Sequence, residues 1–184
     1  PHRPAVKSGE ALTVLFVGRL QERKRVDHLI KACAQLPPSQ QPELVIVGDG
    51  PAAEALQSLA GATYPKTRFT GALYGEALAE QFRAADIFAL PGTGGLAIQQ
   101  AMSYGLPVIA AEADGTQADL VRPENGWQIP PDDLPALITA LEKVLSDVSR
   151  LRQMGENSYR IVAEEINLEQ MVGVFLDVMN RCAA

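Results

Sequence analysis

The sequence is poor in the residues from which metal centres and catalytic triads are built. Among its 184 residues are two cysteines, Cys33 and Cys182, and two histidines, His2 and His28. The cysteines are far apart and lack metal-ligand spacing, so no metal site is predicted. Neither histidine shares a recognisable motif with a serine or cysteine, which leaves no evident triad. We therefore assign no catalytic residue in this chain and expect neither a metal nor another cofactor.

Basic charge and long apolar runs are also scarce. The chain has 16 Lys and Arg residues against 22 Asp and Glu residues, a net charge of −6, which argues against a nucleic-acid-binding surface. No apolar run approaches the ~20 residues that cross a bilayer, and no signal peptide begins the chain. Because the first residue is Pro1 rather than Met, we expect a fragment or a processed chain. The length and the apolar content of 47% are typical of one soluble globular domain.

Short apolar segments alternate with segments of helical period along most of the chain. Residues 1–10 are polar and without period, and are interpreted as a linker or tag remnant before a domain at 11–184. The predicted strands are 12–17, 44–47, 68–70, 86–90 and 107–110, with a short apolar segment at 127–129. The predicted helices are 26–36, 52–60, 77–85, 96–104, 134–145, 148–164 and 168–181.

Continuously apolar strands that alternate with helices indicate a mainly parallel sheet covered on both faces. The predicted fold class is therefore α/β, a three-layer Rossmann-like domain with extra C-terminal helices. Within the helices, we expect Cys33 to be a buried thiol and His28 to lie at the surface or half-buried. Asp132 or Asp133 is expected to cap the helix 134–145.

Ligands of such folds bind at the carboxyl ends of the strands, so the loops after the strands are the candidate sites. Arg19, Arg23, Lys24 and Arg25 follow the first strand and precede a helix. Cations beside a helix N-terminus suit a phosphate or diphosphate. A solvated, charged face is the alternative interpretation of the same run.

Glycine-rich segments follow the second and fourth strands. Gly48-Asp-Gly-Pro51 lets the backbone approach a ligand closely, or makes only a tight turn. Gly92-Thr-Gly-Gly95 directly precedes a helix that begins at Leu96, so free N–H groups there could face an anion. A plain turn is again the alternative. Neither a G-x-G-x-x-G after the first strand nor a Walker A spacing is present.

Taken in order, these segments resemble the retaining family-four glycosyltransferases. Phe16-Val-Gly-Arg-Leu20 with Lys24 and Val26-Asp27 resembles "FVGRL…EKGVD", and Val45 to Pro51 resembles "IVGDGP". Five further segments resemble family motifs: Ala85 to Pro91 ("ADVFVLPS"), Ala101 to Ala110 ("EAMA-G-PVIA"), Asn125 to Asp132 ("NGLLVPPGD"), Met154-Gly155 and Asn167 to Glu169 ("SWE"). The resemblance runs from about residue 12 to the end at family spacing.

The resemblance implies the nucleotide-sugar-binding, C-terminal half of an enzyme with two Rossmann-like domains, the GT-B architecture. Arg19 and Lys24 would hold the donor diphosphate, together with the backbone N–H groups of Gly95 and Leu96. The segment Gly48, Asp49, Gly50 and Pro51 would lie near the base. The donor would be a nucleotide-sugar such as a UDP- or GDP-sugar.

The resemblance also implies what lies outside the chain. Transfer to a saccharide or lipid acceptor, with retained anomeric configuration, would need the N-terminal half, which carries the acceptor site and a catalytic histidine. The isolated fragment is expected to transfer no sugar. Its expected partners are the nucleotide-sugar and that missing domain, with no nucleic acid. The expected location is the cytoplasm, with association of the full enzyme with the inner membrane face left open.

The chain departs from the family pattern at two acids. Family members have two glutamates in "E-G-F-G-L-x-x-x-E-A-M", and the aligned residues are Gly92 and Gln100. Gln100 could still bind a ribose hydroxyl through its amide, without the strength of a charged acceptor. Gly92 offers no side chain to the sugar, so Gly92, Thr93 and Gly94 are only neighbours of the predicted sugar site. Arg25 also replaces the usual glycine after the lysine, where it could add a cation or face water.

Two other functions are weighed against this one. A degenerate, non-catalytic homologue acting as a binding module is favoured by the two missing acids and opposed by the retained Arg19 and Lys24. A nucleotide-sugar epimerase of related architecture is disfavoured by the order of the motifs.

Overall fold

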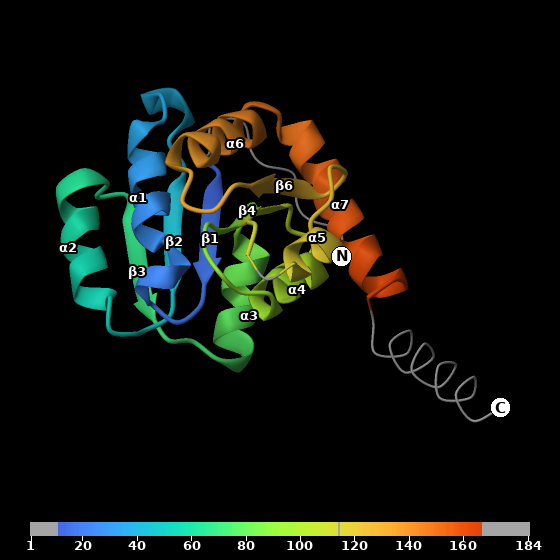
Figure 1. Cartoon of the computed structure of the whole chain (residues 1–184), viewed down its shortest axis with the longest axis horizontal. Helices are drawn as coiled ribbons and strands as arrows, with labels where there is room; N and C mark the ends of the chain where they lie inside the picture. Colours follow the sequence, from blue (N-terminus) through green and yellow to red (C-terminus); the bar gives the residue numbers. More distant parts are fainter. Residues whose placement is uncertain (1–10, 114, 167–184) are drawn as a thin grey trace.

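The computed structural model describes residues 11–113 and 115–166. Its core is a six-stranded sheet of order β3-β2-β1-β4-β5-β6 (Figure 1). All neighbouring strands are parallel. The strands are β1 (Thr13–Val17), β2 (Glu43–Val47), β3 (Thr67–Gly71), β4 (Ile87–Leu90), β5 (Val108–Ala111) and β6 (Gly126–Ile129).

Helices connect the strands and cover the sheet on both faces. They are α1 (Val26–Gln35), α2 (Ala53–Thr63), α3 (Gly75–Ala84), α4 (Leu96–Ser103), α5 (Thr116–Leu120), α6 (Leu134–Ser146) and α7 (Val148–Glu164). Because βαβ crossovers are right-handed, the reversal of strand order after β3 moves the connecting helices to the opposite face. Accordingly, α1 packs against α2 and α6, whereas α4 packs against α7. The predicted α/β, Rossmann-like class is confirmed.

Burial explains why the strands could be recognised in the sequence. Every residue of β4 and β5 is buried, and Val14, Leu15 and Phe16 of β1 have no exposed surface. Strands that are covered on both faces need apolar side chains at consecutive positions rather than at alternate ones. The edge strand β3 is half exposed and has no such run. Cys33 is buried in α1 as a free thiol, as expected.

Several details differ from the predicted elements. The five-residue helix α5 lies in a segment for which the sequence predicts neither a helix nor a strand. Of the two candidate caps of α6, Asp133 accepts a hydrogen bond from the N–H of Ala136 at 2.8 Å, whereas Asp132 has a left-handed φ of 58°. The predicted helix 168–181, Cys182 and the segment 1–10 lie outside the described residues. In the described part, no helix is long and apolar enough to span a membrane.

Candidate functional site

The strand order reverses between β1 and β4, so the loops after these two strands meet at the carboxyl edge of the sheet. These are the residues 18–25 and 91–95, the two loops that the sequence marks with cations and glycines. In open α/β sheets such a reversal leaves a crevice for ligands. The topology therefore brings the two predicted halves of the site together.

The larger cavity at this edge has a volume of about 740 Å³. It contains Arg19 and all four residues of the segment predicted to lie near the base. Its lining residues are Val17, Gly18, Arg19, Val47, Gly48, Asp49, Gly50, Pro51, Ala72, Leu73, Tyr74 and Leu78. Its lining combines apolar side chains and glycines with one cation, Arg19, and one carboxylate, Asp49, and a cavity with apolar surface and a few polar groups suits a flat ring joined to a polar group.

The glycines of the loop after β2 allow this loop to pack closely against the loop after β1. A Cβ atom on Gly48 would lie 1.9 Å from the carbonyl oxygen of Gly18, and one on Gly50 would lie 2.3 Å from that of Leu20. The N–H of Leu20 donates to the carbonyl of Asp49 at 2.9 Å. These glycines thus form the tight turn weighed in the sequence, and the same turn forms part of the cavity wall.

Lys24 joins the first loop to the loop after β4. Its Nζ donates to the carbonyl oxygen of Thr93, and the N–H of Thr93 donates to the carbonyl of Arg23 at 3.1 Å. A Cβ atom on Gly94 would lie 2.6 Å from Nζ, so glycine leaves the path for the lysine. Burial, followed by the charge of Arg23, lowers the pKa of Lys24 below its usual value. A further anion would relieve the cost of holding this ammonium group partly buried.

The helix α4 begins at the same point with an open N-terminus. Gly95 occupies the position before the first helical residue, and no side chain of the described residues caps the helix. Leu96, the first helical residue, is 87% exposed. Free N–H groups and the positive end of the helix dipole are thus presented beside Lys24, where an anion would be stabilised.

The position of the first missing acid is filled by backbone. A Cβ atom on Gly92 would lie 2.2 Å from the carbonyl oxygen of Arg23 and 2.5 Å from the carbonyl carbon of Lys24. A glutamate cannot fit there without moving one of the two loops. Gly92 and Thr93 also line a second cavity of about 320 Å³, together with Arg23, Arg25 and Asp132.

Gln100, at the position of the second missing acid, is exposed on α4. It is not among the described residues that line either cavity. Its assignment to the ribose stays a prediction.

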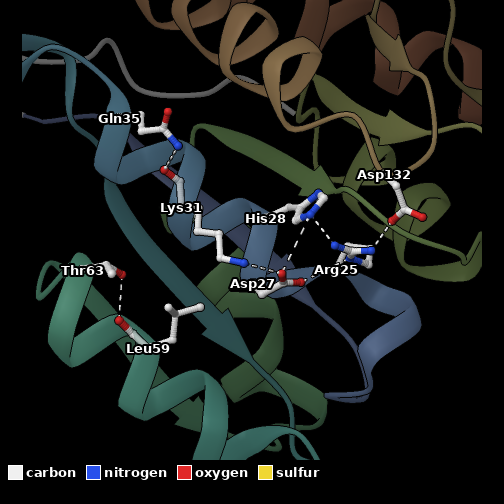
Figure 2. Close-up of polar contacts among 8 residues, drawn as sticks. All are labelled: Arg25, Asp27, His28, Lys31, Gln35, Leu59, Thr63 and Asp132. Atoms are coloured by element: carbon white, nitrogen blue, oxygen red, sulfur yellow. Dashed lines mark hydrogen bonds and ion pairs between the residues drawn. The ribbon is translucent and has the colours of Figure 1, made fainter.

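Arg25, which the sequence left as an added cation or a solvated residue, belongs to a charged cluster in the structure. It pairs with Asp27 at 3.3 Å and with Asp132, and Figure 2 shows it between Asp132 and His28. Its φ of 52° lies in the left-handed region, which explains why glycine is usual at this position in the family. Lys31 completes the cluster with a 2.9 Å bond to Asp27.

His28 is half-buried, as predicted, and its side chain is 13% exposed. Its Nε2 atom contacts the Arg25 guanidinium, which can only donate, so the neutral ring accepts there. Burial lowers the pKa of His28, Asp27 raises it, and Arg25 lowers it further. Among the described residues, no group of three or more His, Cys, Asp or Glu is placed to hold a metal ion.

Two residues of the site were missed in the sequence. Tyr74, in the loop after β3, is 81% exposed and lines the larger cavity. Its place in the loop after a strand is a signal that could have found it, because ligands of such folds bind at the loops that follow the strands. Gln117 contacts the glycine loop from α5, and no local pattern marks it.

The geometry agrees with similarity to known proteins. Residues 2–161 match the family model of the glycosyl transferases group 1, so the chain belongs to this family. The GDP-mannose-dependent alpha-mannosyltransferase of Corynebacterium glutamicum is 37% identical over 150 residues, which are 80% of this chain and 34% of that protein. The chain spans less than half the length of the curated relatives it matches.

Solved structures share the fold. HepE of Anabaena in complex with UDP has a TM-score of 0.82 at 22% identity, covering 94% of this chain and 49% of that one. The C-terminal domain of the group 1 glycosyl transferase LpcC from Francisella tularensis has a TM-score of 0.77 at 21% identity, covering 86% of this chain and 88% of that one.

Proposed function

We propose that this chain is the donor-binding, C-terminal half of a retaining glycosyltransferase that takes its sugar from a nucleotide-sugar. One observation carries the proposal: the 740 Å³ cavity with Arg19 in its wall lies at the sheet edge where Lys24 and the uncapped N-terminus of α4 also meet. A partly apolar cleft next to cations and free N–H groups suits a base joined to a diphosphate.

In this proposal each part of the donor has its own place. The base enters the cavity between Gly48–Pro51 and Tyr74, and the diphosphate lies between Arg19, Lys24 and the N-terminus of α4. The sugar then lies near the glycine loop at 92–94. When the glycosidic bond to the diphosphate breaks, negative charge grows on the leaving oxygen, and preorganised cations and N–H groups stabilise it. HepE, which has the same fold, binds UDP.

The acceptor and the catalytic histidine would come from a second domain across the cleft. The chain covers less than half of its relatives' length, and the LpcC domain, a C-terminal domain of similar extent, supports this placement. Positioning donor and acceptor together supplies a large part of the rate. The chain alone is therefore expected to bind a nucleotide-sugar but to form no glycoside when a radiolabelled donor and candidate acceptors are added.

The second candidate is a binding module descended from such an enzyme. The residues at the positions of the two family acids favour it, because Gly92 is closed off by backbone and Gln100 lacks a charge. Transfer of a labelled sugar by the chain together with its N-terminal half would exclude the module. Binding of nucleotide without transfer by the two halves together would favour it.

Calorimetry on the chain with UDP, GDP and ADP tests donor binding. We expect one of the three to bind in the micromolar-to-millimolar range, roughly 4–8 kcal/mol. Arg19→Ala and Lys24→Ala should each weaken that binding about tenfold or more, since hydrogen bonds to charged groups contribute about 1.5–3 kcal/mol. Lys66→Ala is the matched control, because Lys66 precedes β3 at the opposite edge of the sheet. Equal affinity in all four proteins would contradict the diphosphate site.

A further inference from the structure

Gln117 is a buried polar residue next to the proposed diphosphate site. It lies in α5 and is 1% exposed. Its Nε2 donates to the carbonyl oxygen of Gly94 at 2.7 Å, across 23 positions of sequence. Among the described residues, no donor bonds to its Oε1 atom. The amide is thus half satisfied, with its nitrogen directed at the glycine loop.

A half-satisfied buried amide is unfavourable for stability. A buried acceptor without a donor costs its desolvation, whereas an apolar side chain of the same shape would avoid that cost. Local departures of this kind are expected where function constrains a residue. The contact that Gln117 does make therefore indicates what the residue is for.

The geometry of the peptide bond shows what this contact controls. The carbonyl of Gly94 and the N–H of Gly95 belong to one planar trans peptide, so they point in opposite directions. Gly94 has a φ of 148°, which side chains rarely allow, and the peptide between two glycines rotates easily. A donor that holds the Gly94 carbonyl on the buried side therefore directs the Gly95 N–H away from Gln117, out of the packed interior.

We propose that Gln117 is a positioning residue that orients the Gly94–Gly95 peptide so that the Gly95 N–H donates to the donor diphosphate. The inference rests on the proposed function. Without Gln117, the peptide can rotate and present the carbonyl of Gly94 to the phosphate oxygens, which is repulsive. Lys24 holds the preceding carbonyl, that of Thr93, in the same loop. Two consecutive carbonyls are thus fixed by side chains from distant parts of the chain.

The test compares Gln117→Met, which keeps the length of the side chain but cannot donate, with Gln99→Met. Gln99 is the matched control because its amide also donates to a backbone carbonyl, that of Ile166, at 3.0 Å. The 15N-labelled chain is titrated with the nucleoside diphosphate that binds in the calorimetry above, written here as UDP, and with the matching nucleoside, written as uridine, which has no phosphate. Its melting temperature is also recorded. For Gln117→Met we expect UDP affinity to fall about tenfold, with uridine affinity and melting temperature maintained. The shift of the Gly95 amide on UDP addition should be lost.

Each outcome is decisive. Unchanged UDP affinity and an unchanged Gly95 shift in Gln117→Met would overturn the inference, as would equal losses for UDP and uridine, which would indicate general disruption of the site. If Gln117→Met fails to fold, Gln117→Leu replaces it, with the same expected loss of UDP affinity and the same maintained uridine affinity. If the wild type binds uridine but gains nothing from the diphosphate of UDP, the proposed function fails, and the role of Gln117 with it.

Discussion

Replacing Gly92 by alanine tests the contact that closes off the position of the first missing acid. The added Cβ atom would lie 2.2 Å from the carbonyl oxygen of Arg23, closer than any non-bonded contact permits. This oxygen and the carbonyl carbon of Lys24, which would lie 2.5 Å from the Cβ atom, both belong to the backbone. The loop after β1 or the loop after β4 must therefore move. Overpacking of this kind costs about 1–3 kcal/mol, and the stiffer unfolded chain returns about 0.4–1 kcal/mol of that.

Gly61→Ala is the matched control. Gly61 lies in α2, and a Cβ atom there would meet nothing within 4 Å. Alanine in a helix is about 0.5–1 kcal/mol more favourable than glycine, so this variant should melt at a higher temperature than the wild type. The same substitution thus has opposite expected effects at two positions of one protein.

Thermal unfolding followed by circular dichroism measures both changes. The middle of the two ranges leaves a net cost of about 1.3 kcal/mol. For a domain of this size, 1 kcal/mol corresponds to roughly 2–4 °C, so Gly92→Ala should lower the melting temperature by about 3–5 °C. Gly92→Glu, which introduces the acid of the family, should be at least as destabilising and should not improve donor binding. A Gly92→Ala protein as stable as the wild type would refute the packing argument. A stable Gly92→Glu protein with tighter sugar-nucleotide binding would restore the role of the missing acid.

Two further predictions concern single polar side chains. The pKa of His28 is lowered in the fold, so the unfolded chain binds the proton more tightly, and stability is lost as the pH falls below about 6.5. Burial raises the pKa of Asp27, but Lys31, Arg25 and His28 lower it below 3.8 overall. The stability that Asp27 contributes is therefore lost only at a lower pH than that of His28. His28→Asn should therefore flatten the fall in melting temperature between pH 7 and pH 5, and an unchanged slope would count against the assignment. Gln100→Glu should widen the preference for a ribonucleotide over its deoxy analogue if Gln100 lies at the ribose; calorimetry with UDP and dUDP measures the gap, and no change in either affinity would place Gln100 elsewhere.

The parallel sheet and its order of elements could be predicted from the sequence, because a strand that is buried on both faces has apolar residues at consecutive positions. The strands β4 and β5 are apolar at every position, and helices of regular period separate them. The places of the two site loops followed from the same pattern, since ligand loops come after strands. The pattern marked the four cations after β1 and the start of α4, the family resemblance selected Arg19 and Lys24 among those cations, and their binding role stays a prediction. The helix α5 was missed because five residues are too few to show a period.

Only the tertiary structure decided what the residues of those loops contact. From the sequence, Gly48 and Gly50 fit a ligand-binding loop and a tight turn equally well. The structure shows the turn, because the carbonyl oxygens of Gly18 and Leu20 occupy the space that a Cβ atom at either position would need. Arg25 meets Asp132 across 107 positions, and Gln117 meets Gly94 across 23. Periodicity and turn composition record the environment of a residue along its own element. Contacts between loops depend on which strands are neighbours in the sheet. Here they depend on the pairing of β4 with β1, which only the tertiary structure shows.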